Sequence, residues 1–147
     1  MTTIVATMKV MAGDAMVSAE SKGIWYPTRK IRRITGGIVG AAGDGGDCSR
    51  FMDWAATGFA ERKRPKFTEA PGTEDEAVLL LLNADGIHLM STTDPYPELV
   101  SMDYFAIGSG GKAALGALYA GAELEKAMDI AHAVDPYTRP PFTYEKL

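Results

Sequence analysis

The dipeptide Asp85-Gly86 stands between two apolar segments, residues 77–83 and 87–92, and this arrangement constrains the fold more than any other part of the chain. Asp-Gly is favoured in two-residue hairpin turns, where both central residues need a positive φ. The sequence therefore predicts a β-hairpin here. The longest apolar run of the chain, residues 77–82, lies in the first strand of this predicted hairpin. It is far too short to span a bilayer.

Residue patterns and glycine-rich corners predict the remaining elements. We expect strands at residues 2–7, 10–16, 24–26, 29–34, 38–42 and 104–107, helices at residues 48–64, 112–119 and 123–133, and a short strand or turn in residues 134–147. The first two strands would meet in a tight turn at Met8-Lys9, which lacks the Gly, Asn or Asp that such turns favour. Residues 65–76 contain Pro and Gly without periodicity, so we expect a loop. This order indicates one layered α+β domain, residues 1–147, and not alternating βαβ units.

Composition and charge exclude several classes of protein. The 147 residues carry 15 Lys or Arg and 19 Asp or Glu, which gives a net charge of −4. Proteins that coat nucleic acid or are held on anionic membranes by charge need a net basic surface, so we expect neither partner. The single cysteine, Cys48, excludes an intrachain disulfide and a multi-Cys metal site. No basic segment precedes an apolar one at the start, so we expect no signal peptide, a cytoplasmic location, and neither metal nor cofactor.

The first residues suggest a nucleophile. Thr2 follows Met1, and an initiator Met is normally removed before a small residue, so the mature chain can begin at Thr2. An N-terminal Thr carries a hydroxyl and an α-amine whose pKa of about 7.7–8.0 lets it act as a base near neutral pH. Such a residue is a self-sufficient pair of nucleophile and base. Many chains begin Met-Thr by chance, so this feature does not decide the function alone.

Asp14 and Lys30 are candidates for adjusting that amine. Asp14 ends the second predicted strand, and Lys30 follows it within a basic segment. A buried Lys would lower the pKa of a neighbouring amine by repulsion, and a carboxylate partner would hold the Lys in place. The alternative is that Lys30 belongs to a solvated strand face and that Asp14 only ends a strand.

Two glycine-rich corners each join a predicted strand to a helix. The first, residues 40–46, suits an oxyanion hole built from backbone N–H groups or, less well, a dinucleotide phosphate site. The second, residues 108–111, contains Ser109, which either serves a site or caps the helix. Cys48, His88 and His132 are too few to indicate a metal site, and structural roles are favoured for them over a Cys–His dyad.

Together, three blocks of sequence resemble the bacterial HslV peptidase family and, through it, the β subunits of proteasomes. The blocks are Thr2-Thr3-Ile4-Val5 directly after Met1, Ala12-Gly13-Asp14 followed at the family's spacing by Lys30-Ile31-Arg32-Arg33-Ile34, and Tyr104-Phe105-Ala106-Ile107-Gly108-Ser109-Gly110-Gly111 continuing through residues 127–131 to Tyr137-Thr138. They span both ends of the chain in the family's order. The resemblance implies a four-layer α/β/β/α sandwich of the N-terminal nucleophile hydrolases, acting as a threonine peptidase.

The resemblance also implies roles for individual residues. Thr2 would be the nucleophile and its freed α-amine the proton acceptor, while Lys30 would adjust the amine and Asp14 would pair with Lys30. Gly40, at the position that matches the family's loop glycine, would offer its N–H to the oxyanion. Ser109 would orient the terminus and relay protons.

Further positions are implied by the same resemblance. Asp135 and Thr138 look like the proteasomal Asp-x-x-Ser that braces the amino terminus. The wall of the specificity pocket would be Val17, Ile38 and Ala42, which implies apolar side chains ahead of the cleaved bond.

One segment departs from the family. The family has a second long helix beside the first, ahead of the central hairpin, and residues 65–76 cannot hold such a helix. The resemblance therefore implies a shortened subunit of a homo-oligomeric ring that cleaves polypeptides, with an AAA+ ATPase unfoldase as the expected partner. The alternatives are a non-catalytic assembly subunit that keeps the fold for its interfaces, and an amidohydrolase of the same class acting on a small molecule.

Overall fold

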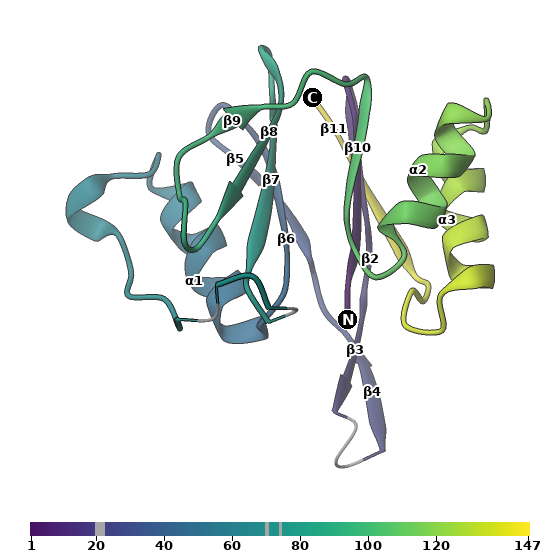
Figure 1. Ribbon diagram of the computed structural model, residues 1–147, viewed down its shortest axis with the longest axis horizontal. Helices are drawn as coiled ribbons and strands as arrows, with labels where there is room; N and C mark the ends of the chain where they lie inside the picture. The colour runs from purple at the N-terminus through teal and green to yellow at the C-terminus, as the bar shows by residue number, and fades with distance from the viewer. Residues whose placement is uncertain (20–22, 70, 74) are drawn as a thin grey trace.

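Two antiparallel sheets lie face to face, and helices cover the outer face of each sheet (Figure 1). The computed structural model describes residues 1–19, 23–69, 71–73 and 75–147. The strands are β1 (Thr3–Thr7), β2 (Val10–Asp14), β3 (Met16–Ala19), β4 (Ile24–Pro27), β5 (Ile31–Ile34), β6 (Gly37–Ala42), β7 (Val78–Asn83), β8 (Gly86–Ser91), β9 (Glu98–Leu99), β10 (Tyr104–Gly108) and β11 (Phe142–Lys146). The helices are α1 (Gly45–Ala56), the short 3-10 helix η2 (Glu61–Lys63), α2 (Gly111–Tyr119) and α3 (Leu124–Val134). The predicted four-layer α/β/β/α sandwich is confirmed.

The first sheet has the strand order β10-β1-β2-β11 and the second has the order β5-β6-β7-β8-β9. The strands β3 and β4 pair with each other and project from one end of the sandwich (Figure 1). The last strand, β11, runs antiparallel to β2, from Phe142 opposite Asp14 to Lys146 opposite Val10. The first and the last strands of the chain therefore lie in one sheet, on either side of β2.

Three apolar clusters join the layers. The cluster between the sheets includes Ile4, Ile31 and Leu80, which are fully buried. Four of the eight buried residues in the cluster beneath α2 and α3 are alanines, whereas the cluster beneath α1 includes Phe51 and Trp54. Burial of these apolar faces supplies the main favourable free energy for stacking the layers.

The two predicted hairpins are confirmed, but the turn of the β7–β8 hairpin is displaced by one residue. Asn83 pairs with Gly86, so the turn residues are Ala84 and Asp85, neither of which has a positive φ. Gly86 begins β8 with a φ of +130°, which a residue with a side chain rarely adopts. The turn at Met8-Lys9 forms without glycine because the side chain of Thr7 satisfies its backbone: Oγ1 of Thr7 accepts from the N–H of Lys9 at 3.2 Å and from that of Val10 at 3.0 Å. Such local side-chain hydrogen bonds are a known substitute for turn glycines.

The first helix is displaced from its predicted range of 48–64. It begins at Gly45, because the Asp44 carboxylate caps it by accepting from the N–H of Asp47 at 2.9 Å. It ends at Ala56, two residues before Gly58 takes a φ of +74°, which a helix cannot continue. The predicted strand 10–16 also divides into β2 and β3.

The predicted loop between α1 and β7 is confirmed for the residues that the structure describes between 64 and 77, none of which is helical. Phe59 and Phe67 pack against the cluster beneath α1, where the second helix of the family was expected to lie. Nowhere in the described ranges is there a helix both long and apolar enough to cross a membrane.

Candidate active site

Thr2 lies directly before β1, near the end of the sandwich from which the β3–β4 hairpin projects (Figure 1). Its carbonyl accepts from the N–H of Ser109 at 2.9 Å. Gly108 has a φ of +90°, and a Cβ there would collide with the Thr2 carbonyl oxygen. The glycine at the end of β10 therefore lets the two strands approach closely enough to hold Thr2.

Asp14 and Lys30 form a buried ion pair beside Thr2. The Lys30 ammonium donates to Asp14 Oδ2 at 2.9 Å, to the Met1 carbonyl at 3.0 Å and to the Met16 carbonyl at 2.6 Å. The exposed fraction is 0% for Asp14 and 6% for Lys30, so water contributes little to either charge. The hypothesis of a solvated Lys30 is therefore wrong, and the predicted pairing with Asp14 is present.

The environment of this pair shifts the pKa of each group in the direction that favours its neutral form. Burial raises the pKa of Asp14, although the attraction of Lys30 and the hydrogen bonds to the carboxylate oppose the shift. Burial likewise lowers the pKa of Lys30 against the attraction of Asp14. The second carboxylate oxygen, Oδ1, accepts from the N–H of Thr3 at 2.7 Å. Asp14 thus joins Lys30 to the first residue of β1.

A second network lies on the other side of the terminus. Asp135 Oδ2 accepts from the hydroxyls of Ser109 at 2.7 Å and Thr138 at 2.6 Å. The hydroxyls of Thr3 and Thr138 lie 2.6 Å apart, and Thr3 Oγ1 accepts from the N–H of Gly110 at 2.9 Å. Burial raises the pKa of Asp135, but hydrogen bonds from Thr138 and Ser109 outweigh it and bring the pKa below its usual value. Asp135 therefore stays ionised at neutral pH.

Two pockets meet at Thr2 and Gly43. The first, of about 250 Å³, is lined by Thr2, Val17, Tyr26, Thr28, Arg29, Lys30, Ala41, Gly43, Gly45, Cys48, Ser49 and Met52; we call it the Lys30 pocket. The second, of about 380 Å³, is lined by Met1, Thr2, Ala42, Gly43, Asp75, Gly108 and Ser109; we call it the Ser109 pocket. A peptide bond placed over Thr2 would have a hollow available for each of two side chains.

The three residues predicted to form the pocket wall lie in three different places. Val17 lines the Lys30 pocket and Ala42 lines the Ser109 pocket, but Ile38 is fully buried between the sheets. Successive residues of a strand point to opposite faces, so Ile38 and Ala42 face the first sheet while Ala41 faces α1 and reaches the Lys30 pocket. Ile38 is therefore a core residue and not part of the pocket wall.

Gly40 does not reach Thr2 either. It lies inside β6, paired with Ile31 on one side and Leu80 on the other, and a Cβ at this position would press on Ile4. Gly40 lets the two sheets pack closely, and it lines neither pocket.

The glycine that does reach Thr2 is three residues further on. Gly43 is exposed, lines both pockets, and has a φ of +126°. Its N–H forms no hydrogen bond within the part of the chain that the structure describes. The sequence had a signal for it, because residues 40–46 were identified as a glycine corner, but it did not indicate which glycine the corner turns toward Thr2.

The other reactive side chains do not form a competing site. Burial, together with Asp44 and Asp47, raises the pKa of Cys48 to about 12, so its thiol stays neutral. His132 Nδ1 lies 2.6 Å from the Thr138 carbonyl, a structural contact beneath the second network. The described ranges contain no group of His, Cys, Asp and Glu that could hold a metal ion.

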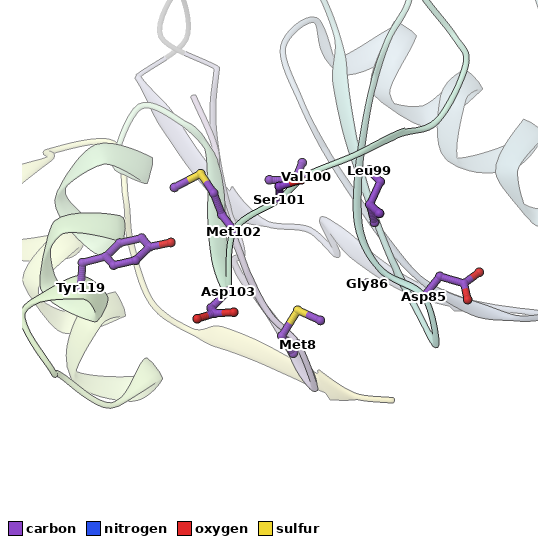
Figure 2. A pocket seen from close by; sticks show the side chains of 9 residues that line it. All are labelled: Met8, Asp85, Gly86, Leu99, Val100, Ser101, Met102, Asp103 and Tyr119. Atoms are coloured by element: carbon purple, nitrogen blue, oxygen red, sulfur yellow. The ribbon is translucent and has the colours of Figure 1, made fainter.

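A separate groove of about 410 Å³ lies at the opposite end of β1 (Figure 2). It is bordered by Met8, the β7–β8 turn, the segment before β10 and Tyr119 of α2, and it carries the carboxylates Asp85 and Asp103. We call it the far groove. Because the length of β1 separates it from Thr2, its carboxylates are useful controls for experiments on the site.

A hydroxyl residue at the start of an inner strand, between two sheets that are covered by helices, is the arrangement of the N-terminal nucleophile hydrolases. This is the class of protein that the fold and the site define.

Comparison with known proteins gives the family within that class. No family model matches the chain. The ATP-dependent protease subunit HslV of Caulobacter sp. (strain K31) is 30% identical over 175 aligned positions, which cover 99% of this chain and 94% of the relative. The subunit of the same description from Caulobacter vibrioides is also 30% identical, over 99% of this chain and 93% of the relative. These alignments are longer than the 147 residues of the chain, so they contain gaps in it, as expected of a shortened member.

Solved structures agree on the fold. Eukaryotic HslV from Trypanosoma brucei superposes with a TM-score of 0.71 at 24% identity, covering 99% of this chain and 98% of that one. The structure described as Thiobacillus denitrificans BPH gives 0.69 at 18% identity, covering 99% and 96%. The chain belongs to the HslV family of threonine peptidase subunits.

Proposed function

We propose that this chain is the catalytic subunit of a ring-shaped, ATP-dependent protease, with Thr2 as its nucleophile once Met1 is removed. One observation carries the proposal: the buried Lys30 ammonium, held by Asp14, lies 3.0 Å from the carbonyl of the Met1–Thr2 peptide bond. When that bond is cut, the new α-amine of Thr2 forms beside a fixed positive charge. Such a charge lowers the pKa of the amine and keeps a larger fraction of it in the basic form.

The reaction would be acyl transfer in two steps. The Thr2 hydroxyl attacks the peptide carbonyl and passes its proton to the α-amine. The tetrahedral intermediate collapses to an ester on Thr2 Oγ, and the leaving amine takes the proton from the α-ammonium. Water then attacks the ester, with the same amine as base, and releases the acid. Ser109, bonded to ionised Asp135, would hold the terminus and relay protons.

We assign the oxyanion to Gly43 in place of Gly40. An oxyanion hole needs a backbone N–H that is free in the ground state and directed at the developing charge. Gly43 is exposed beside Thr2, whereas Gly40 is enclosed by its neighbouring strands. Apolar side chains ahead of the cleaved bond would enter the Lys30 pocket, against Val17, Ala41 and Met52.

The names of the relatives support the proposed partners. Caulobacter HslV is named as a subunit of an ATP-dependent protease, so we expect this chain to form a homo-oligomeric ring and to receive polypeptides from an ATPase unfoldase. We also keep the sequence-based prediction of a cytoplasmic location.

The proposal is tested with chains released from a cleavable amino-terminal fusion so that they begin at Thr2. We expect this chain to hydrolyse peptides and to be labelled by Thr-directed inhibitors, and Thr2→Ala to abolish both. Thr2→Ser is the matched control, because it keeps a hydroxyl and should retain labelling. Far-UV circular dichroism checks that each variant folds.

Native mass spectrometry completes the test by reporting the state of Met1 and the number of subunits. Full retention of Met1 in the native host would contradict the proposal. A Met-free ring that never reacts at Thr2 would favour a non-catalytic assembly subunit, and a reactive monomer would favour a small-molecule amidohydrolase.

A further inference from the structure

The Ser109 pocket contains a carboxylate that the catalytic residues do not use. Asp75 lines this pocket together with Thr2 and Ser109, and it is exposed. It belongs to the segment between α1 and β7, which takes the place of the expected second helix. No salt bridge to Asp75 occurs among the residues that the structure describes.

The backbone around Asp75 is held in place by its neighbours. The Asp75 carbonyl accepts from the N–H of Asp44 at 2.9 Å, which ties the segment to the glycine corner. The Glu76 carboxylate accepts from the N–H of Gly72 at 2.8 Å and from the hydroxyl of Thr93. Because these bonds use the backbone of Asp75 and the side chain of Glu76, the Asp75 carboxylate itself remains available to a ligand.

The two pockets that meet at Thr2 differ in charge. The described lining of the Lys30 pocket has two cationic side chains, Lys30 and Arg29, but each is already paired, Lys30 with Asp14 at 2.9 Å and Arg29 with Glu145 at 3.3 Å. Among the residues that the structure describes, Asp75 is the only one with a charged side chain that lines the Ser109 pocket. A polypeptide bound across both pockets therefore meets paired cations on one side and, on the other, a carboxylate that forms no salt bridge with any described residue.

We propose that Asp75 selects substrates that place a Lys or Arg side chain in the Ser109 pocket and disfavours those that place Asp or Glu there. This inference rests on the proposed peptidase function. A volume of about 380 Å³ accommodates a long basic side chain, and the carboxylate attracts its charged end. Because Asp75 is exposed and screened by water, the preference is modest, of the size measured for surface ion pairs.

The test uses the chain that begins at Thr2 and internally quenched peptides carrying Lys, Gln or Glu at each position around the cleaved bond. At one position we expect the wild-type chain to show a higher kcat/KM for Lys than for Glu. Asp75→Asn should reduce that ratio about threefold to fivefold, and Asp75→Lys should invert it. The change should appear mainly in KM, since the charge acts on binding.

Two controls separate this effect from others. Asp103→Asn removes a carboxylate from the far groove and should leave the ratio unchanged (Figure 2). Raising the salt concentration should reduce the Lys preference of the wild-type chain without any substitution, because screening weakens exposed charge pairs.

The outcomes distinguish the two proposals. An equal Lys-to-Glu ratio at every position in wild type and Asp75→Asn, with hydrolysis intact, would overturn this inference and leave the peptidase function standing. Failure of the wild-type chain to hydrolyse any peptide of the series would overturn the proposed function and this inference with it.

Discussion

The two helical layers of this protein cover the outer faces of their sheets in different ways. The first sheet is covered by the helix pair α2 and α3, whose buried residues include the small side chains Ala114, Ala127 and Ala131. In the described part of the chain, α1 is the one α-helix over the second sheet. Its cluster includes four aromatic side chains, Phe51, Trp54, Phe59 and Phe67, whose neighbouring ring centroids lie 5.1 to 6.5 Å apart.

The difference shows how a sheet face can stay covered after a helix is lost. Two helices supply much backbone, so alanines together with a few larger side chains such as Leu118 and Met128 fill the layer. One helix and an irregular segment supply less, so large rings fill the remaining volume. The irregular segment is fixed by Asp47, whose carboxylate accepts from the N–H of Thr68 at 3.0 and 3.2 Å. The covering layer can thus change while the strands that hold Thr2 remain.

The largest expected effect comes from removing the central ring of the single-helix layer. Phe51 is fully buried, so Phe51→Ala should lower the free energy of unfolding by about 3–5 kcal/mol, from lost burial and the cavity that remains. Urea unfolding measures it, with an unchanged m value as the sign that the native fold persists. A loss below about 1 kcal/mol would show that the rings do not replace the missing helix.

The opposite substitution probes the two-helix layer. Ala127 is fully buried beneath α3, so Ala127→Leu should overpack the layer and cost about 1–3 kcal/mol in the free energy of unfolding. Ala133→Leu on the exposed side of the same helix is the control and should change stability little. Equal effects at both positions in urea unfolding would argue against tight packing in this layer.

A smaller effect on the free energy of unfolding is expected at Asp47, which attaches the irregular segment to α1. Asp47→Asn keeps the shape but removes the charge that strengthens the bonds to Thr68, so the free energy of unfolding should fall by about 1 kcal/mol. Asp53→Asn is the control, since the side chain of Asp53 is 74% exposed and pairs with Arg32 at the surface. Limited proteolysis should cut residues 60–69 faster in Asp47→Asn than in Asp53→Asn; equal rates would contradict this role.

The smallest effect concerns pH and the sheet that holds Thr2. The pKa of Asp135 is lower in the folded chain than its ordinary value of 3.8. The carboxylate therefore stabilises the fold above about pH 4, and this contribution is lost as the pH falls through the folded-state pKa. The stability difference between wild type and Asp135→Asn should thus shrink below pH 4 in urea titrations. A stability difference between the two proteins that stays constant from pH 6 to pH 3 would refute the conclusion that the pKa of Asp135 is lowered in the folded chain.

Much of the fold could be predicted from local sequence. The β7–β8 hairpin and the two carboxyl-terminal helices follow from rules that act over a few residues, although the hairpin turn lies one residue before the predicted Asp85-Gly86. The boundaries of α1 could not be predicted from local sequence. Asp44 caps the start of the helix and Gly58 follows its end only because of the backbone conformation that forms there. The absence of a second helix was predicted, but the rings that fill its place were not, since Phe67 reaches Phe51 through an irregular path.

The candidate site, like the fold, could be predicted only in part. The resemblance to the HslV family, carried by the motifs that contain Thr2, Lys30 and Ser109, predicted which residues gather at the terminus, whereas spacing alone left a solvated Lys30 open. The sequence was misleading at Gly40 and Ile38, because strand alternation and pairing place both in the core.

By itself, the sequence determined the chemical groups of this protein: a Thr that can become the amino terminus, a Lys–Asp pair, and a Ser and an Asp to brace them. Only the tertiary structure placed Gly43 and Asp75 in the lining of pockets that Thr2 shares. The physical reason is that turn and strand preferences act between near neighbours, whereas the lining of a pocket depends on how distant segments pack. Asp75 lines the same pocket as Thr2, and it belongs to the irregular segment that stands in place of the expected second helix.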